Sequence, residues 1–308
     1  MTTLENTAPS SSRQALKPFR GIRILSLALN LPGPAALMRC DNMGASCVKL
    51  EPLPPKGSAL GVTGDPMSLY NPEAYAALHQ GIRTTAADLK TDAGQKALHR
   101  ELAKADVLIT SFRPSAIEKL GLNWKQLHKR YPALSQIAIV GSPGARAEEP
   151  GHDLTYLAEN DLVTGLDLPA TLYADMGGSL MTSEAVLQAT PMQRATGKGV
   201  FMEVALSDAA AYLALPRAWG LTKAEGPVGG AHAGYGVYAC KDGRVAVAAL
   251  EPHFAARLCA AAGVAGMGAE TMFSAATRKL VAAFLLAQTR SGLQKLAIEK
   301  DIPMKVLP

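Results

Sequence analysis

Short apolar segments alternate with helical patterns through the first half of the chain. Five segments have the length and composition of strands: residues 21–28, 45–50, 83–89, 106–109 and 135–140. Helical patterns separate several of them, such as the helix that Thr91 caps, in which Leu98 and Leu102 are four residues apart. Because strands that alternate with helices form parallel sheets covered on both faces, the pattern predicts an α/β fold.

The second half of the chain is mainly helical. From residue 152 onward we predict helices over 179–193 and 206–219, then a hairpin over 237–249 and further helices over 252–299. A Gly-rich stretch precedes the hairpin and breaks the pattern. We therefore expect four parts: a loose tail at 1–20, a large α/β domain at 21–220, a linker at 221–236 and a small α/β domain at 237–308.

The composition is that of a globular protein with a sizeable core, since 48% of the residues are hydrophobic and 19% are charged. The net charge of +5 favours an anionic partner: nucleic acid, an acidic membrane or a phosphorylated small molecule. The basic residues are scattered, which argues against nucleic acid. No apolar run approaches the roughly 18 residues of a membrane span, and residues 1–20 lack the apolar core of a signal peptide. We expect a cytoplasmic protein without a nucleic-acid or membrane partner.

Several common motifs are missing from the sequence. No GxGxxG follows a strand, no G-x-S-x-G occurs, and Thr196–Gly199 lacks the upstream glycine of a phosphate loop. The cysteines show no CxxC pairing, so we expect free thiols and no metal site. These cysteines are Cys40, Cys47, Cys240 and Cys259.

Two polar residues are candidates for proton transfer. His152 stands at the start of a predicted helix, and Asp175 precedes Gly177 and Gly178, whose N–H groups could hold an oxyanion where the next helix begins. An imidazole and a carboxyl on opposite sides of one substrate carbon could remove a proton from one face and return it to the other. The alternatives are a helix-start histidine that touches water, with Asp153 as the helix cap, and a turn-forming aspartate. The remaining histidines are predicted to be surface or loop residues: His79, His99, His128, His232 and His253.

Short motifs spread over nearly the whole chain identify a family. The matching segments are Pro32–Pro34, Gly44–Glu51, Ala87–Lys90, Ala105–Ile109, Phe112–Pro114, Lys119–Leu122 and Thr196–Gly199. In these segments and their order the chain resembles the family III CoA-transferase (CaiB/BaiF) superfamily. Two further segments, Gly151–Asp153 and Leu250–Phe254, are similar to its α-methylacyl-CoA racemase branch.

The resemblance implies an architecture and a set of site residues. Members are interlaced homodimers in which a large Rossmann-like domain binds CoA and a small α/β domain of the other subunit closes the site. By motif match, His152 and Asp175 would be the acid/base pair and Glu251 would support the imidazole. CoA would enter as part of an acyl-CoA substrate, without a tightly bound cofactor. Its contacts would come from Arg83, Lys90, Arg113 and Lys119.

The sequence is compatible with three functions. A racemase would move a proton at the α-carbon of an acyl-CoA, and the Gly151–Asp153 motif favours it. A family III transferase would instead use Asp175 as a nucleophile that carries CoA as an aspartyl thioester, with His152 superfluous. A third possibility is a non-catalytic relative that binds CoA or only dimerises, which the short spacing of 175 − 152 = 23 residues between the two groups motivates.

Overall fold

The computed structural model describes residues 16–265 and 269–308, so most of the predicted tail at 1–20 lies outside the described residues. The chain divides between Leu213 and Ala214 into two compact units, each with its own hydrophobic core. The predicted assignment of a linker to 221–236 remains a prediction.

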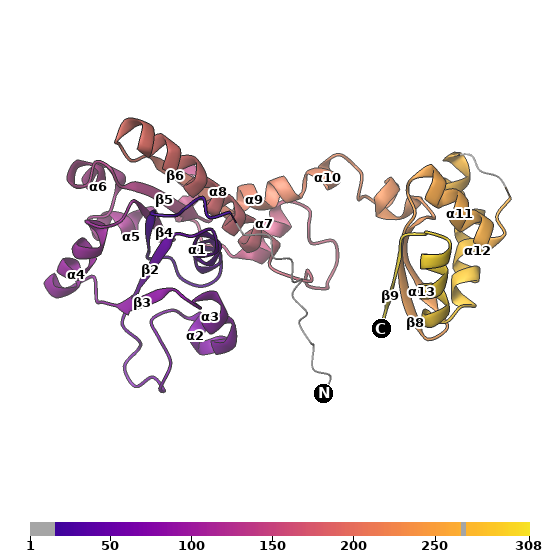
Figure 1. Ribbon diagram of the computed structural model, residues 1–308, viewed down its shortest axis with the longest axis horizontal. Helices are drawn as coiled ribbons and strands as arrows, with labels where there is room; N and C mark the ends of the chain where they lie inside the picture. The colour runs from indigo at the N-terminus through magenta and orange to yellow at the C-terminus, as the bar shows by residue number, and fades with distance from the viewer. Residues whose placement is uncertain (1–15, 266–268) are drawn as a thin grey trace. The chain divides into compact units, whose positions relative to one another are not determined.

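A six-stranded parallel sheet forms the centre of the first unit (Figure 1). Its strands lie in the order β3-β2-β1-β4-β5-β6, so the direction of strand addition reverses between β1 and β4. All five predicted strands are present. The sixth, β6, was not predicted; it is an edge strand of mixed burial that pairs with β5 alone. The strands are β1 Arg23–Ser26, β2 Ser46–Glu51, β3 Arg83–Ala86, β4 Val107–Thr110, β5 Ser135–Val140 and β6 Phe201–Ala205.

Helices cover both faces of this sheet, as the alternation of patterns predicts. Successive strand residues point to opposite faces: Ile24 packs with α1, α7 and α8, whereas Leu25 packs with α4, α5 and α6. The α/β fold with a parallel sheet is confirmed. The helices of this unit are α1 Pro32–Asn42, α2 Met67–Tyr70, α3 Pro72–Leu78, α4 Asp92–Leu102, α5 Pro114–Lys119, α6 Trp124–Arg130, α7 Asp153–Glu159, α8 Tyr173–Thr196 and α9 Leu206–Leu213, with a short 3₁₀ turn at Gly144–Glu148.

The start of α8 differs from the prediction. The helix begins at Tyr173, so the expectation that it opens at Gly177 and Gly178 is wrong. A Cβ on Gly178 would lie 2.2 Å from the side chain of Leu206 in α9, and one on Gly177 would lie 3.2 Å from Leu213. The two glycines therefore let α8 and α9 approach closely, and Asp175 lies in the first turn of α8 rather than in a turn before it.

The second unit is built on a three-stranded antiparallel sheet in the order β7-β8-β9. The predicted hairpin is present as β7 Tyr235–Cys240 and β8 Gly243–Ala248, while the third strand, β9 Met304–Leu307, was not predicted. Buried residues of the strands and helices form the core. The helices are α10 Leu215–Ala218, α11 Pro252–Ala262, α12 Ala275–Leu286 and α13 Arg290–Glu299, with single turns at Pro227–Ala231 and Ala269–Phe273. Among the described residues, no helix is both long and apolar enough to cross a bilayer.

Candidate active site

A cavity of about 180 Å³ lies at the carboxyl edge of the parallel sheet. Asn30 follows β1, Arg113 follows β4 and Gly141 follows β5, and all three line the cavity. Strands β1 and β4 are the neighbours between which the strand order reverses. Loops diverge at such a point and leave a crevice, which is where open α/β sheets bind their ligands.

The structure brings His152 and Asp175 to this one cavity. His152 is the N-cap residue of α7, and its N–H donates to the hydroxyl of Thr155 at 3.0 Å. The next residue, Asp153, is buried, and its carboxylate accepts the N–H of Asp175 at 2.9 Å. This hydrogen bond holds the first turn of α8 against the first turn of α7. Two residues from different helices, α7 and α8, therefore line the same space.

The surroundings of Asp175 change its acidity. Burial, and after it the neighbouring charge of Asp153, raise the pKa of its carboxyl; with His152 opposing the rise, the pKa moves from 3.8 to about 6. Such a carboxyl exchanges its proton near neutral pH, where an acid/base catalyst works best.

A tyrosine that was not predicted as a site residue lies beside this pair. Tyr156 lines the cavity, and a Cβ placed on Gly141 or Gly151 would come within 2.3 or 2.6 Å of its hydroxyl oxygen. The Gly151–Asp153 motif thus begins with glycine because the phenol occupies the space of a side chain. Burial and the charge of Asp175 raise the pKa of Tyr156. Its position four residues after His152, on the same helical face, was the available signal.

The four predicted CoA-binding cations occupy different places. Arg113 lines the cavity, and Lys90 lines a neighbouring hollow of about 340 Å³ that shares Phe112 with it. Lys119 is exposed at the end of α5. Arg83 lies at the amino end of β3, where it pairs with Glu101 at 2.7 Å, so the structure does not bring it to the cavity.

Glu251 belongs to the second unit, where it is the exposed N-cap residue of α11. Its predicted support of the His152 imidazole remains a prediction.

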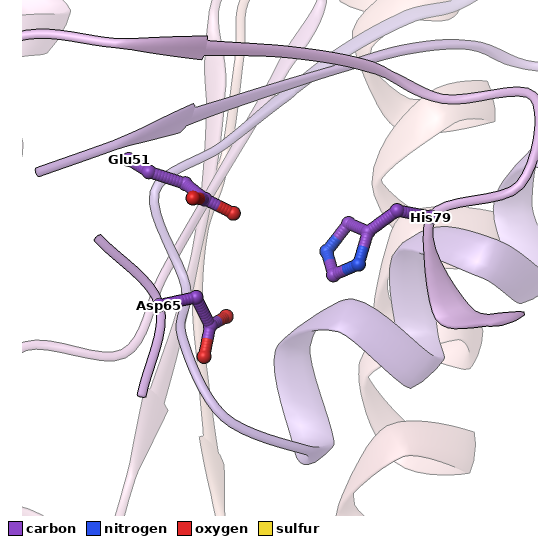
Figure 2. Close-up of side chains that lie close together, drawn as sticks. All are labelled: Glu51, Asp65 and His79. Atoms are coloured by element: carbon purple, nitrogen blue, oxygen red, sulfur yellow. The ribbon is translucent and has the colours of Figure 1, made fainter. Parts of the chain in front are cut away.

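A buried ion cluster contacts Asn30, one of the residues that line the cavity. Figure 2 shows Glu51, Asp65 and His79 pointing toward a common centre, and their ligand atoms lie within 4.8 Å of one another. The ammonium of Lys49 occupies that centre: it pairs with Asp65, lies 3.0 Å from Glu51 and donates to His79 Nε2 at 2.9 Å. A cation is therefore already present where a metal ion would bind.

The protonation of His79 follows from its partners. Its Nδ1–H donates to the carbonyl of Tyr75 at 2.6 Å, and its Nε2 accepts from Lys49. Burial and the charge of Lys49 lower the pKa of His79, so the ring stays neutral. His79 and His232 lie in a turn and a bend, as predicted for loop residues, but both are buried, so a surface position is wrong for these two. The missed signal is the pair Lys49 and Glu51, two charges in a strand of a sheet that is covered on both faces.

Comparison with known proteins agrees with this architecture. The model of CoA-transferase family III matches residues 19–307. The chain belongs to CoA-transferase family III.

Individual relatives include both isomerases and transferases. The chain is 30% identical over 271 residues to the mouse (Mus musculus) "Alpha-methylacyl-CoA racemase". The aligned region covers 82% of this chain and 65% of the relative. It is 29% identical over 208 residues to "Cinnamoyl-CoA:phenyllactate CoA-transferase" of Clostridium sporogenes, covering 63% and 50%. The chain thus spans between half and two thirds of these relatives. The crystal structure of a CAIB/BAIF family protein from Brucella suis shares the fold, with a TM-score of 0.77, 23% identity and coverage of 95% of this chain and 84% of that one.

Proposed function

We propose that the chain acts on acyl-CoA thioesters and moves a proton at the α-carbon, as a racemase does. The observation that carries this proposal is the pairing of an imidazole with a carboxyl of raised pKa, about 6, in one cavity. A transferase of this family would need the aspartate alone.

The proton would move as follows. His152 takes the α-proton from one face, the electron pair of the C–H bond passes into the thioester carbonyl to give an enolate, and Asp175 gives its own proton to the other face. The reverse turnover exchanges the two roles. Near neutral pH a carboxyl with a pKa of about 6 is present both with and without its proton, which suits this alternation.

The CoA portion would extend from this cavity along the carboxyl edge of the sheet. Arg113 would hold it at the cavity, and Lys90 would meet it in the hollow beyond Phe112. Lys119 lies at the other end of α5 from Arg113, fewer than two helical turns away. It would add a positive charge for the phosphates of CoA. CoA would be part of the substrate rather than a resident cofactor. In an interlaced homodimer, Glu251 would come from the partner copy to support the His152 imidazole.

A second candidate is CoA transfer between carboxylic acids. Asp175 lines the cavity, and its carboxylate would attack the thioester and carry CoA as an aspartyl thioester. The Clostridium sporogenes relative, which is named as a transferase, supports this alternative.

Proton exchange separates the two functions. With a panel of branched and straight acyl-CoAs in D₂O, a racemase incorporates deuterium at the α-carbon without an acceptor acid and resists hydroxylamine. A transferase requires the acceptor and is inactivated by hydroxylamine in the presence of the acyl-CoA. Asp175→Ala abolishes either activity. His152→Ala slows exchange by about 10²- to 10⁴-fold, whereas the exposed His253→Ala leaves it unchanged. Deuterium incorporation that survives His152→Ala would contradict the proposed racemase mechanism.

A further inference from the structure

Asn30 follows β1 and lines the cavity together with His152 and Asp175. Its backbone is in the left-handed region, with φ of 63°, which asparagine tolerates better than most residues. This conformation turns the chain immediately before α1, so the side chain of Asn30 stands at the carboxyl edge of the sheet.

A fully buried carboxylate holds Asn30 in this conformation. The N–H of Asn30 donates to both oxygens of Asp65, at 3.1 and 3.2 Å. Asp65 also accepts the N–H of Met67 at 2.9 Å and pairs with the ammonium of Lys49. Lys49 and Asp65 have no exposed side-chain surface. The position of Asn30 is therefore fixed from inside the protein, by an ion pair that water does not reach.

The side chain of Asn30 is oriented by a second contact. The hydroxyl of Tyr70 donates to Asn30 Oδ1 at 3.3 Å. An amide whose oxygen accepts on one side presents its NH₂ group on the other. Burial and the charges of Asp65 and Asp175 raise the pKa of Tyr70, which keeps the phenol protonated and able to donate to Asn30.

We propose that the Asn30 carboxamide donates a hydrogen bond to the thioester oxygen of the substrate, with Asp65 and Lys49 as its positioning residues. The inference rests on the proposed acyl-CoA substrate and deepens it. When the α-proton leaves, negative charge collects on the thioester oxygen, and a donor already fixed in place stabilises that charge without reorganisation. Asn30 would thus supply the oxyanion contact that Gly177 and Gly178, inside α8, do not.

The inference predicts a loss of binding affinity that is specific for ligands with a thioester carbonyl. Asn30→Gly keeps the left-handed backbone and the N–H to Asp65 but removes the carboxamide. Its affinity for acetyl-CoA, measured by calorimetry, is expected to fall by about 3- to 10-fold, while its affinity for free CoA, which has no thioester, stays unchanged. Exchange of the α-proton is expected to slow by about 10²-fold. Asn42→Gly, at the exposed end of α1, is the matched control.

Two further variants make the test robust. Asn30→Asp keeps the size of the side chain and the left-handed backbone but loses both N–H donors of the carboxamide. It should show the same selective loss of affinity for acetyl-CoA. Tyr70→Phe frees the carboxamide to rotate and should give a smaller loss with the same selectivity, an effect that a purely structural role of the tyrosine would not produce.

The outcomes distinguish this inference from the proposed function. Equal weakening of acetyl-CoA and CoA in Asn30→Gly, or no weakening of either, would overturn the inference. A wild-type protein that binds neither molecule would overturn both the inference and the proposed function. If the wild type binds both but exchanges no α-proton, the racemase proposal fails, and a selective loss of acetyl-CoA affinity still supports the role of Asn30.

Discussion

At the scale of single residues, Asp175 shows how position changes chemistry. An aspartate in water titrates near 3.8, whereas burial in the cavity and the neighbouring Asp153 raise the pKa of this carboxyl to about 6. The folded protein therefore binds the Asp175 proton more tightly than the unfolded chain does. This group contributes stability that is complete below about pH 3.8 and lost as the pH rises through 6.

We expect Asp175→Asn to stabilise the protein at neutral pH. The amide removes the cost of a partly buried charge, so the free energy of unfolding should rise by up to about 3 kcal/mol above pH 6. The difference should shrink as the pH falls toward 3.8 and vanish well below it, where the wild-type carboxyl is protonated in both states. Urea denaturation across this pH range measures it. The control is Asp167→Asn in an exposed loop, and a pH-independent difference for Asp175→Asn would contradict the pKa assignment.

At the scale of elements, the buried ion cluster joins three parts of the first unit. Lys49 and Glu51 belong to β2, Asp65 lies in the loop before α2, and His79 follows α3. Tyr75 of α3 adds a hydrogen bond to Glu51 at 2.9 Å. The segment between β2 and β3 is rich in glycine and proline and has little core of its own. We infer that the cluster holds this segment against the sheet.

We predict that Lys49→Met strongly destabilises the protein. Removal of the ammonium leaves two buried carboxylates without their cation, which typically costs about 3–5 kcal/mol. Thermal or chemical denaturation measures the loss. Lys56→Met, in the exposed loop after β2, should change stability by less than about 0.5 kcal/mol. A loss below about 1 kcal/mol for Lys49→Met would show that the cluster does not hold the segment.

At the scale of the whole molecule, the cavity residues belong to the first unit, and Glu251 belongs to the second. Large apolar side chains near the division between the units are exposed. Tyr212 is 70% exposed and Trp219 is 67% exposed. Aromatic residues are enriched where proteins associate. They are consistent with the proposed interlaced homodimer.

The dimer can be tested in solution. Light scattering after size-exclusion chromatography should give twice the mass of the chain, and Trp219→Ser should shift the equilibrium toward monomer. The protein has two tryptophans, so fluorescence of a Trp124→Phe variant follows Trp219 alone and should shift to longer wavelength on dilution. A monomeric wild type at micromolar concentration would contradict the proposal.

Much of the fold could be predicted from local patterns. Strands β1, β2, β4 and β5 are short, largely apolar runs, and this signal does not depend on the rest of the chain. Strand β3 is mostly exposed and was recognised by its Thr-rich segment between turn residues. Strands β6 and β9 are edge strands with mixed burial, and both were missed although most of their residues are apolar. The start of α8 was misplaced because Gly177 and Gly178 read as a turn, although close packing against α9 keeps them helical.

The sequence by itself determined the α/β class and the family, and it put forward His152 and Asp175 as a candidate pair, because periodicity and short motifs depend on residues that are close together in the sequence. The tertiary structure alone decided what surrounds them. It brought Asp153 to the backbone of Asp175, placed Tyr156 between two glycines, and put Lys49 at the centre of three ligand-type side chains. Burial and long-range electrostatics set pKa values and fixed contacts, and both depend on residues that meet only when the chain has folded.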